Sequence, residues 1–180
     1  MTENTRRVVV TGLGLVSPVG STVTKAWDNI KNGVSGIRKI TSFDASSFSV
    51  QISGSVVDFN ADDFITPKNQ KKMDTFIHYG IGASVMAIND AGLEISEENS
   101  DRIGISIGSG IGGLPYIEKN YGNFLQNGPR KISPFFVPSS IINMVSGNLS
   151  IMYGITGPNL SLVSACATGT HSIGDAACLL

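Results

Sequence analysis

The sequence predicts an α/β fold in which a mixed, mostly parallel sheet packs between helices. Short apolar runs typical of buried strands alternate with longer segments of helical periodicity, and glycine clusters mark tight turns between them. Hydrophobic residues make up 41% of the 180 residues and charged residues 15%, which is typical of a packed globular protein. Because no repeat or linker divides the chain, we expect one domain over residues 1–180.

The first third of the chain predicts a strand, a helix and a loop-rich segment. Residues 7–11 form a short apolar run that indicates a buried strand. A helix is expected over residues 22–31, with Gly33 as its stop. Its apolar face comprises Ala26, Trp27 and Ile30. The loop-rich segment, residues 34–67, should contain one or two edge strands, and residues 50–57 are the best candidate.

The middle of the chain predicts a long helix and a tightly packed strand. Apolar residues recur at helical spacing over residues 69–91, and Gly92 supplies the C-terminal cap. Residues 102–108 alternate between large apolar and small side chains, which indicates a strand. The small residues leave room for another element to approach closely: Gly104, Ser106 and Gly108.

Three further elements follow a polar stretch that contains aromatic residues. Residues 140–153 predict a helix, residues 159–165 a second buried strand, and residues 166–180 a final helix. The inward side chains of the first helix are Ile141, Met144, Val145 and Leu149. The apolar stripe of the final helix comprises Ile173, Ala176, Ala177 and Leu180.

Charge and hydropathy exclude several classes of protein. The net charge is −1, so nothing marks the chain as a binder of nucleic acid or of membrane surfaces. No run approaches the roughly 18 apolar residues of a membrane span, and the N-terminus lacks the apolar stretch of a signal peptide. We therefore expect a cytoplasmic protein with neither nucleic acid nor membrane as a partner.

The two cysteines are predicted to be free thiols. If Cys166 and Cys178 lie on one helix, their separation along it is roughly 18 Å, whereas a disulfide needs Cα atoms within about 7 Å. Cys178 lies among Ala177, Leu179 and Leu180, and we expect it to be an ordinary core residue.

Residues 157–176 carry the strongest functional signal. A predicted strand ends at Cys166, small residues follow, and an apolar helix begins there. Free N–H groups and the positive end of a helix dipole favour a thiolate over a thiol, and the cysteine N–H can face the oxyanion of a thioester under attack. From this geometry alone, Cys166 is either a nucleophile on a sharp strand-to-helix turn or a small buried hydrophobe.

The spacing around Cys166 resembles the active-site signature of the β-ketoacyl-acyl-carrier-protein synthases. Gly157, Leu162 and the small residues after Cys166 occupy the expected places, and the segments RRVVVTGLGLVSPVG and GPRKISPFFVPSSIINM are similar to the same family. The pattern is closest to the elongating type, synthase II. The resemblance implies the N-terminal half of a thiolase-like fold and identifies Cys166 as the acyl-accepting nucleophile.

Enzymes of this family move an acyl chain from acyl carrier protein to the cysteine and condense it with a malonyl group, which loses carbon dioxide. The resemblance implies neither a cofactor nor a metal ion. It implies two histidines and a lysine from a C-terminal half, which a chain ending at Leu180 does not contain. His171 is expected to pack or hydrogen-bond within the fold, and His78 to be a surface or structural residue. We therefore expect the 180 residues alone to be inactive or nearly so.

The resemblance also assigns pocket and docking residues. Ile111 matches an acyl-pocket position near a dimer interface, and Phe136 matches a position that lines the same pocket from the partner subunit of a homodimer. The alternative for both is ordinary core. Five basic residues match positions that meet the acidic helix of acyl carrier protein, the alternative being a solvated face. They are Lys68, Lys71, Lys72, Arg130 and Lys131.

Other interpretations of the sequence stay open or are weaker. One is a non-catalytic partner subunit that shapes chain length, although such subunits typically lack the active cysteine. Another is a thiolase that uses coenzyme A, against which the GPRKISPFFVPS segment counts. Residues 108–113, GSGIGG, also fit a dinucleotide fingerprint, but no acidic residue follows at the spacing that such a site needs. We therefore expect no nucleotide there.

Overall fold

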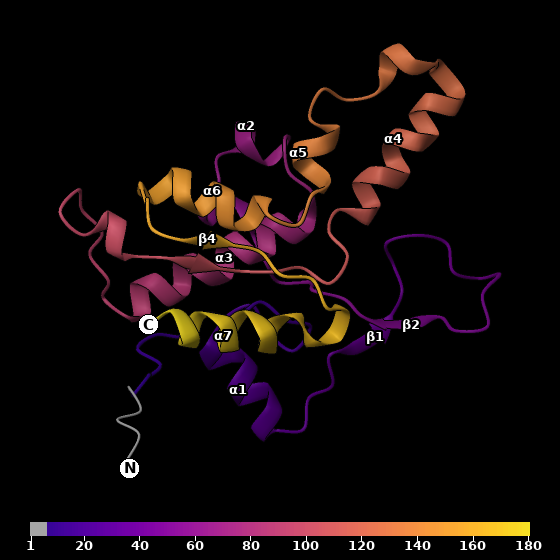
Figure 1. Ribbon diagram of the computed structural model, residues 1–180. Helices are drawn as coiled ribbons and strands as arrows, with labels where there is room; N and C mark the ends of the chain where they lie inside the picture. Colours follow the sequence, from indigo (N-terminus) through magenta and orange to yellow (C-terminus); the bar gives the residue numbers. More distant parts are fainter. Residues whose placement is uncertain (1–6) are drawn as a thin grey trace.

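The computed structural model describes residues 7–180, so residues 1–6 of the predicted domain lie outside the described part (Figure 1). The helices are α1 Val23–Lys31, α2 Pro67–Gln70, α3 Thr75–Asp90, α4 Leu114–Asn127, α5 Phe136–Ser140, α6 Met144–Tyr153 and α7 Thr168–Leu179. The strands are β1 Ile37–Lys39, β2 Ile52–Gly54, β3 Ile105–Ser106 and β4 Asn159–Leu160. Short 3₁₀ helices are η1 Ala61–Asp63, η2 Ser100–Arg102, η3 Pro129–Lys131 and η4 Ala165–Ala167.

Two small sheets organise these elements. β1 and β2 pair antiparallel, and β3 and β4 pair parallel with Ile105 opposite Asn159. The β3–β4 pair lies between α3 and α6 on one side and α7 on the other (Figure 1). The layered α/β prediction is therefore confirmed, and the edge strand expected within residues 50–57 is β2.

The core lies where α3 crosses α6 over β3. Ile77 and Ile81 of α3 have no exposed surface, and Val145 and Leu149 of α6 are almost fully buried against them. Ile105 of β3 belongs to the same cluster. Burial of apolar surface at roughly 25 cal/mol per Å² makes this cluster the main source of stability within the described residues.

Several predicted elements differ in the structure. The strand predicted at residues 7–11 is wrong, because this run pairs with no other described strand and leaves Val9 and Val10 largely exposed. The strand predicted over 102–108 is reduced to β3, and the buried strand predicted over 159–165 is reduced to the exposed pair β4. The sheet is thus narrower than periodicity alone predicts.

The single helix predicted over residues 69–91 is two helices, α2 and α3. Asp74 ends the continuity because its side chain accepts from the N–H of Phe76 and caps α3. The C-terminal prediction is confirmed, since α3 ends at Asp90 and Gly92 adopts a left-handed φ of 58°.

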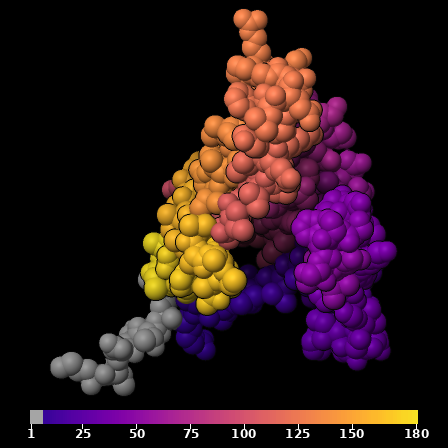
Figure 2. All heavy atoms as spheres, turned by 90° about the vertical axis from the view of Figure 1, so that its right-hand side faces the viewer, coloured from indigo at the N-terminus to yellow at the C-terminus, as the bar shows by residue number. Residues whose placement is uncertain are grey.

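The helix predicted over residues 140–153 is also divided. α5 ends at Ser140 and α6 begins at Met144, so Ile141 lies between them and is exposed. Helix α4, in the stretch treated as polar and aromatic, was not predicted. Residues 114–132, here called the α4 arm, form a projection from the body of the molecule (Figure 2).

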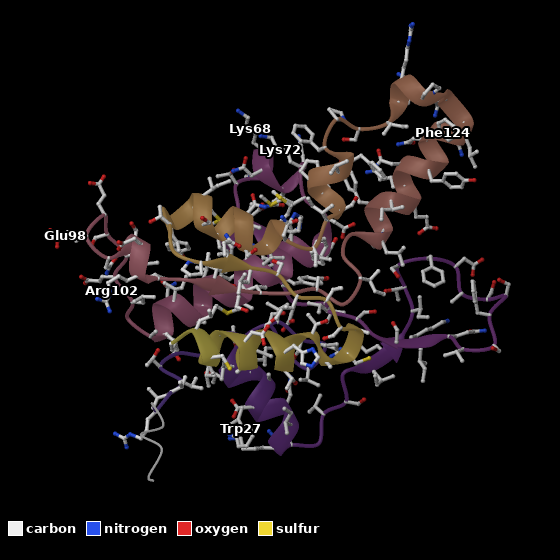
Figure 3. The ribbon with its side chains drawn as sticks, viewed as in Figure 1. Trp27, Lys68, Lys72, Glu98, Arg102 and Phe124 are labelled. Carbon is white, nitrogen blue, oxygen red and sulfur yellow. The ribbon has the colours of Figure 1, made fainter. Side chains whose placement is uncertain are left out.

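Helix α1 is confirmed, with Thr22 as its cap and Gly33 at a φ of 66° after it. Only Ala26 of its predicted apolar face is buried. Trp27 and Ile30 are exposed, and Trp27 points away from the body of the molecule (Figure 3). The face of α1 that packs on the described part of the chain is therefore smaller than the sequence predicts.

Candidate active site

Cys166 lies on a sharp turn between β4 and α7. The turn spans residues 164–168, here called the Cys166 turn, and includes η4. Ala165 has a φ of 53°, and it is the one non-glycine residue with positive φ among residues 7–180. A left-handed conformation costs an L-residue roughly 1–2 kcal/mol, so the surrounding contacts must sustain this turn.

The turn exposes the thiol as the sequence predicts. Cys166 is exposed, and its neighbours Ala165 and Ala167 are small and exposed as well. Helix α7 begins at Thr168, so Cys166 lies just before the helix, and the predicted start at residue 166 is two residues early. No side chain caps α7. η4 leads directly into it, so the Thr168 N–H donates to the Ala165 carbonyl oxygen and the Ala167 N–H to the Ser164 carbonyl oxygen.

Thr168 holds the turn from inside. Its hydroxyl donates to the Ala165 carbonyl oxygen at 2.8 Å and accepts from the Ser164 N–H at 2.9 Å. The Ala167 N–H donates to the Ser164 carbonyl oxygen at 3.2 Å. Thr168 is only 5% exposed, so these bonds are shielded from competing water.

Residues 108–113, here called the glycine loop, lie against the Cys166 turn. A Cβ on Gly108 would overlap the Leu162 carbonyl oxygen and Thr168 Cγ2, so only glycine allows this approach. A Cβ on Gly110 would lie 3.4 Å from the Ala165 carbonyl oxygen. Ile111, which follows directly, is 72% exposed. The structure therefore brings the loop that carries Ile111 to the Cys166 turn.

Phe136 belongs to a different part of the molecule. It lies on α5 and lines an apolar cavity of about 280 Å³ between α5 and the α4 arm. The other lining residues are Ile117, Asn120, Tyr121, Phe124 and Ile132. Neither Cys166 nor Ile111 lines this cavity, so the role of Phe136 in a pocket shared between subunits stays a prediction.

Asp74 is a buried carboxylate that sequence reasoning missed. It is 5% exposed, and it caps α3 through Phe76 while its Oδ2 accepts from the Tyr116 N–H at 2.7 Å. The signal was present, since an aspartate directly before an apolar helical run is a typical N-cap. The Asp74 carboxylate thus accepts hydrogen bonds from the amino ends of both α3 and α4.

The Asp74 carboxylate also bears on whether the glycine loop could bind a dinucleotide. Helix α4 begins at Leu114, directly after Gly113 of the glycine loop, as a dinucleotide site requires. The amino end of α4 is already occupied by the negative charge of Asp74, which would repel a pyrophosphate. In the structure the glycine loop packs against the Cys166 turn, and the expectation that it binds no nucleotide stays a prediction.

The basic residues form two groups. Lys68 and Lys71 are exposed on and after α2, and the Lys72 ammonium lies 5.5 Å from the centroid of the Phe135 ring. Lys68 and Lys72 lie close together, far from Phe124 on the α4 arm (Figure 3). Arg130 and Lys131 are exposed on η3, which packs on α4. Lys72 is fixed by its aromatic neighbour, whereas the other four extend into solvent.

Comparison with known proteins identifies the family. A family model described as "Beta-ketoacyl synthase, N-terminal domain" matches residues 5–179. The chain belongs to the β-ketoacyl synthase family. It is 55% identical over 172 residues to the 3-oxoacyl-[acyl-carrier-protein] synthase 2 of Vibrio harveyi, a match that covers 96% of this chain and 41% of that protein. The chain therefore spans about two fifths of the length of the curated relatives it matches.

Two solved structures share the fold. A Beta-ketoacyl synthase from Burkholderia phymatum has a TM-score of 0.78 at 26% identity, covering 95% of this chain and 42% of that one. A type II PKS ketosynthase, bound to a hexaketide and in complex with its acyl-carrier protein, has a TM-score of 0.77 at 27% identity, covering 96% and 46%. The thiolase-like fold that the sequence predicted is confirmed.

In this β-ketoacyl synthase chain, the histidines have unequal surroundings. His78 is half-buried, and its Nε2 lies 3.2 Å from the Gln70 carbonyl oxygen, which confirms a structural position. His171 is exposed, and its imidazole makes no hydrogen bond within residues 7–180. The prediction that His171 packs or hydrogen-bonds within the fold is therefore wrong for the described part of the chain.

Helix α7 also turns a different face inward from the one predicted. Thr168 and Ser172 are buried against the sheet, whereas Ile173 and Leu180 are largely exposed. Cys178 is exposed too, so its assignment to the core is wrong. Both thiols are free, as the sequence predicts. Small polar side chains replace the expected apolar stripe because α7 packs closely on β3.

No helix among residues 7–180 combines the length and apolarity needed to cross a membrane.

Proposed function

We propose that these 180 residues are the N-terminal domain of a 3-oxoacyl-acyl-carrier-protein synthase of fatty-acid elongation, a cytoplasmic homodimer in which Cys166 carries the growing chain. The observation that carries the proposal is the exposed thiol on a left-handed turn directly before an uncapped helix. Family membership and 55% identity to a synthase 2 support the same reaction.

The reaction has two parts. The Cys166 thiolate attacks the thioester carbonyl of acyl carrier protein, the tetrahedral intermediate collapses, and the carrier thiolate leaves and takes up a proton. A malonyl carrier protein then loses carbon dioxide, and the resulting carbanion attacks the Cys166 acyl thioester and expels the Cys166 thiolate. We assign to the Cys166 N–H the stabilisation of the oxyanion in both attacks. Decarboxylation needs further groups, which we assign to a C-terminal domain beyond residue 180.

The proposal is tested with the complete gene product. Incubation with acyl carrier protein charged with a fatty acyl group should add one acyl mass to the tryptic peptide that contains Cys166. Addition of malonyl carrier protein should release carbon dioxide and a β-ketoacyl product two carbons longer. An unmodified Cys166 peptide would contradict the role of this thiol. Acylation without carbon dioxide release would instead favour a thiolase, and absence of both would favour the non-catalytic partner subunit.

The two basic groups are proposed to dock acyl carrier protein. Complementary charge raises the encounter rate and sets orientation more than it raises affinity. The triple variant Lys68→Glu, Lys71→Glu, Lys72→Glu should raise the KM for acyl carrier protein about tenfold or more and leave turnover of a small acyl thioester unchanged. The matched control is Lys39→Glu on β1, an exposed lysine that forms no ion pair within residues 7–180. Equal losses with both substrates would contradict docking.

The homodimer is proposed to complete the acyl pocket with Phe136 of a second copy beside Ile111. Phe136→Ala should therefore change the chain-length range of the product in the same direction as Ile111→Ala. Mixed dimers of a Cys166→Ala copy with a Phe136→Ala copy supply the test. In this dimer the one active Cys166 lies in the Phe136→Ala copy, and the one intact Phe136 lies in the Cys166→Ala copy. If each Phe136 serves the other subunit, the active site keeps the wild-type product range. An altered product range would show that Phe136 lines the pocket of its own subunit.

A further inference from the structure

The turn that carries the nucleophile depends on one buried hydroxyl. Thr168 Oγ1 uses both its donor and its acceptor capacity, to the Ala165 carbonyl oxygen at 2.8 Å and from the Ser164 N–H at 2.9 Å. The Ser164 N–H precedes Ala165 in the chain and the carbonyl is that of Ala165 itself, so the two bonds enclose the residue with a φ of 53°. The hydroxyl therefore bridges the left-handed residue from one side to the other.

No other side chain described in the structure shares this task. Ser164 Oγ is buried without a hydrogen-bond partner, and the N-cap residue Ala167 has no side chain that could bond. On the opposite side, Thr168 Cγ2 fills the space in which Gly108 lacks a Cβ. The hydroxyl thus fixes the turn, and the methyl group sets the distance between the turn and the glycine loop.

We propose that Thr168 is the positioning residue of the nucleophile, holding Ala165 left-handed so that Cys166 lies exposed at the start of α7 beside the glycine loop. The identity of the reaction rests on the proposed function, whereas the placement of the thiol can be tested by alkylation alone. Removing the hydroxyl leaves the Ser164 N–H without its partner and leaves the Ala165 carbonyl oxygen with the Thr168 N–H alone, and the turn relaxes toward an ordinary conformation. The sulfur then shifts, and a shift of about 1 Å can slow a reaction about a hundredfold.

The test compares three substitutions in the complete gene product. Thr168→Val preserves shape and removes the hydroxyl, Thr168→Ala removes it with less volume, and Thr168→Ser keeps it. Iodoacetamide alkylation is followed on the Cys166 peptide by mass spectrometry over roughly pH 6 to 9, and kcat and KM are measured for acyl carrier protein. The Val and Ala variants should alkylate and turn over about 10- to 100-fold more slowly. Their KM should stay within about twofold, and the Ser variant should be close to wild type.

Ser161→Ala is the matched control, because it removes a half-buried hydroxyl from the same strand region without touching the turn. Ser161 Oγ donates to the Ile107 carbonyl oxygen at 2.8 Å and lies 2.9 Å from Ser146 Oγ. It should lower the melting temperature as much as Thr168→Ala and leave Cys166 alkylation unchanged. If destabilisation alone slowed the reaction, Cys166 alkylation would be slower in both Ser161→Ala and Thr168→Ala.

Three results would overturn the inference. Wild-type alkylation by the Val and Ala variants would show that the hydroxyl does not place the sulfur. An unchanged kcat with a raised KM would indicate substrate binding in place of positioning. Loss of the folded state in both, with Thr168→Ser intact, would make the hydroxyl a folding requirement. Failure of the wild type to condense malonyl carrier protein would reject the proposed function, and the alkylation result would still decide the role of Thr168.

Discussion

Helices α3 and α7 lie on opposite faces of the β3–β4 pair and bury opposite kinds of side chain (Figure 1). α3 buries the large apolar Ile77 and Ile81, whereas α7 buries Thr168 and Ser172 and leaves Ile173 73% exposed. β3 shows the same division, because Ile105 joins the core beside α3 while the Ser106 hydroxyl donates to the Ser172 carbonyl oxygen at 2.9 Å.

The two helices also begin differently. α3 starts at the Asp74 carboxylate, while α7 starts at Thr168, two residues after Cys166, without a capping side chain. Large buried side chains and a satisfied amino end make α3 a source of stability. Small buried side chains let α7 approach β3, and the turn before its amino end exposes the Cys166 thiol. The comparison teaches that stability and reactivity are assigned to different faces of one small sheet.

The largest effect that tests this division is expected from Cys166→Ala in the complete gene product. Removing the nucleophile should reduce condensation about a thousandfold or more, since groups that act as a unit fail together. Because Cys166 is exposed, the free energy of unfolding should change by less than about 0.5 kcal/mol. Activity assays and urea unfolding check the two expectations. A large loss of stability would place Cys166 in the packed interior instead.

The next effect concerns α3. Ile77→Ala should lower the free energy of unfolding by about 2–5 kcal/mol, because it leaves a cavity in a fully buried site. The matched control is Ile173→Ala on α7, which should cost less than about 0.5 kcal/mol in the 180-residue chain. Denaturant unfolding measures both. Equal costs would show that another segment or chain covers the outer face of α7.

A smaller loss is expected at the shared amino end of α3 and α4. Asp74→Ala removes the acceptor for the Phe76 and Tyr116 N–H groups and should cost about 2 kcal/mol. Thr22→Ala, at the exposed cap of α1, is the control and should cost about half as much. If the two variants unfold alike, the buried carboxylate gives no advantage over an ordinary cap.

The smallest effect should depend on pH. The Lys25 ammonium, 2.6 Å from Asp58 Oδ2, and then the Ser21 hydroxyl lower the pKa of Asp58 to about 2. A lowered folded-state pKa stabilises the protein above the unfolded value of about 3.9, and this contribution is lost as pH falls from about 4 toward 2. Asp58→Asn should remove that part of the acid sensitivity without affecting Cys166 alkylation. An identical pH–stability curve for wild type and variant would reject the ion pair.

Sequence patterns succeeded where one local signal dominated. The Cys166 turn, the stops at Gly33 and Gly92, and the close approach of Gly108 each follow from the steric properties of a few residues. Helix α4 was missed although Leu114, Ile117, Tyr121 and Phe124 recur at helical spacing, because this signal was overlooked among the polar residues and glycines of the segment. The inward face of α7 was predicted wrongly because contact with β3 selects Thr168 and Ser172, a choice that hydrophobicity does not reveal.

The exposure of Cys178 has a practical consequence for thiol chemistry on this protein. A colorimetric titration of the 180-residue chain would count two accessible sulfhydryls, and their rates would merge into one curve. Labelling must therefore be resolved site by site or carried out in a Cys178→Ser background. The same side chain then serves as a footprinting probe, since any polypeptide that settles on the outer surface of α7 would slow its modification.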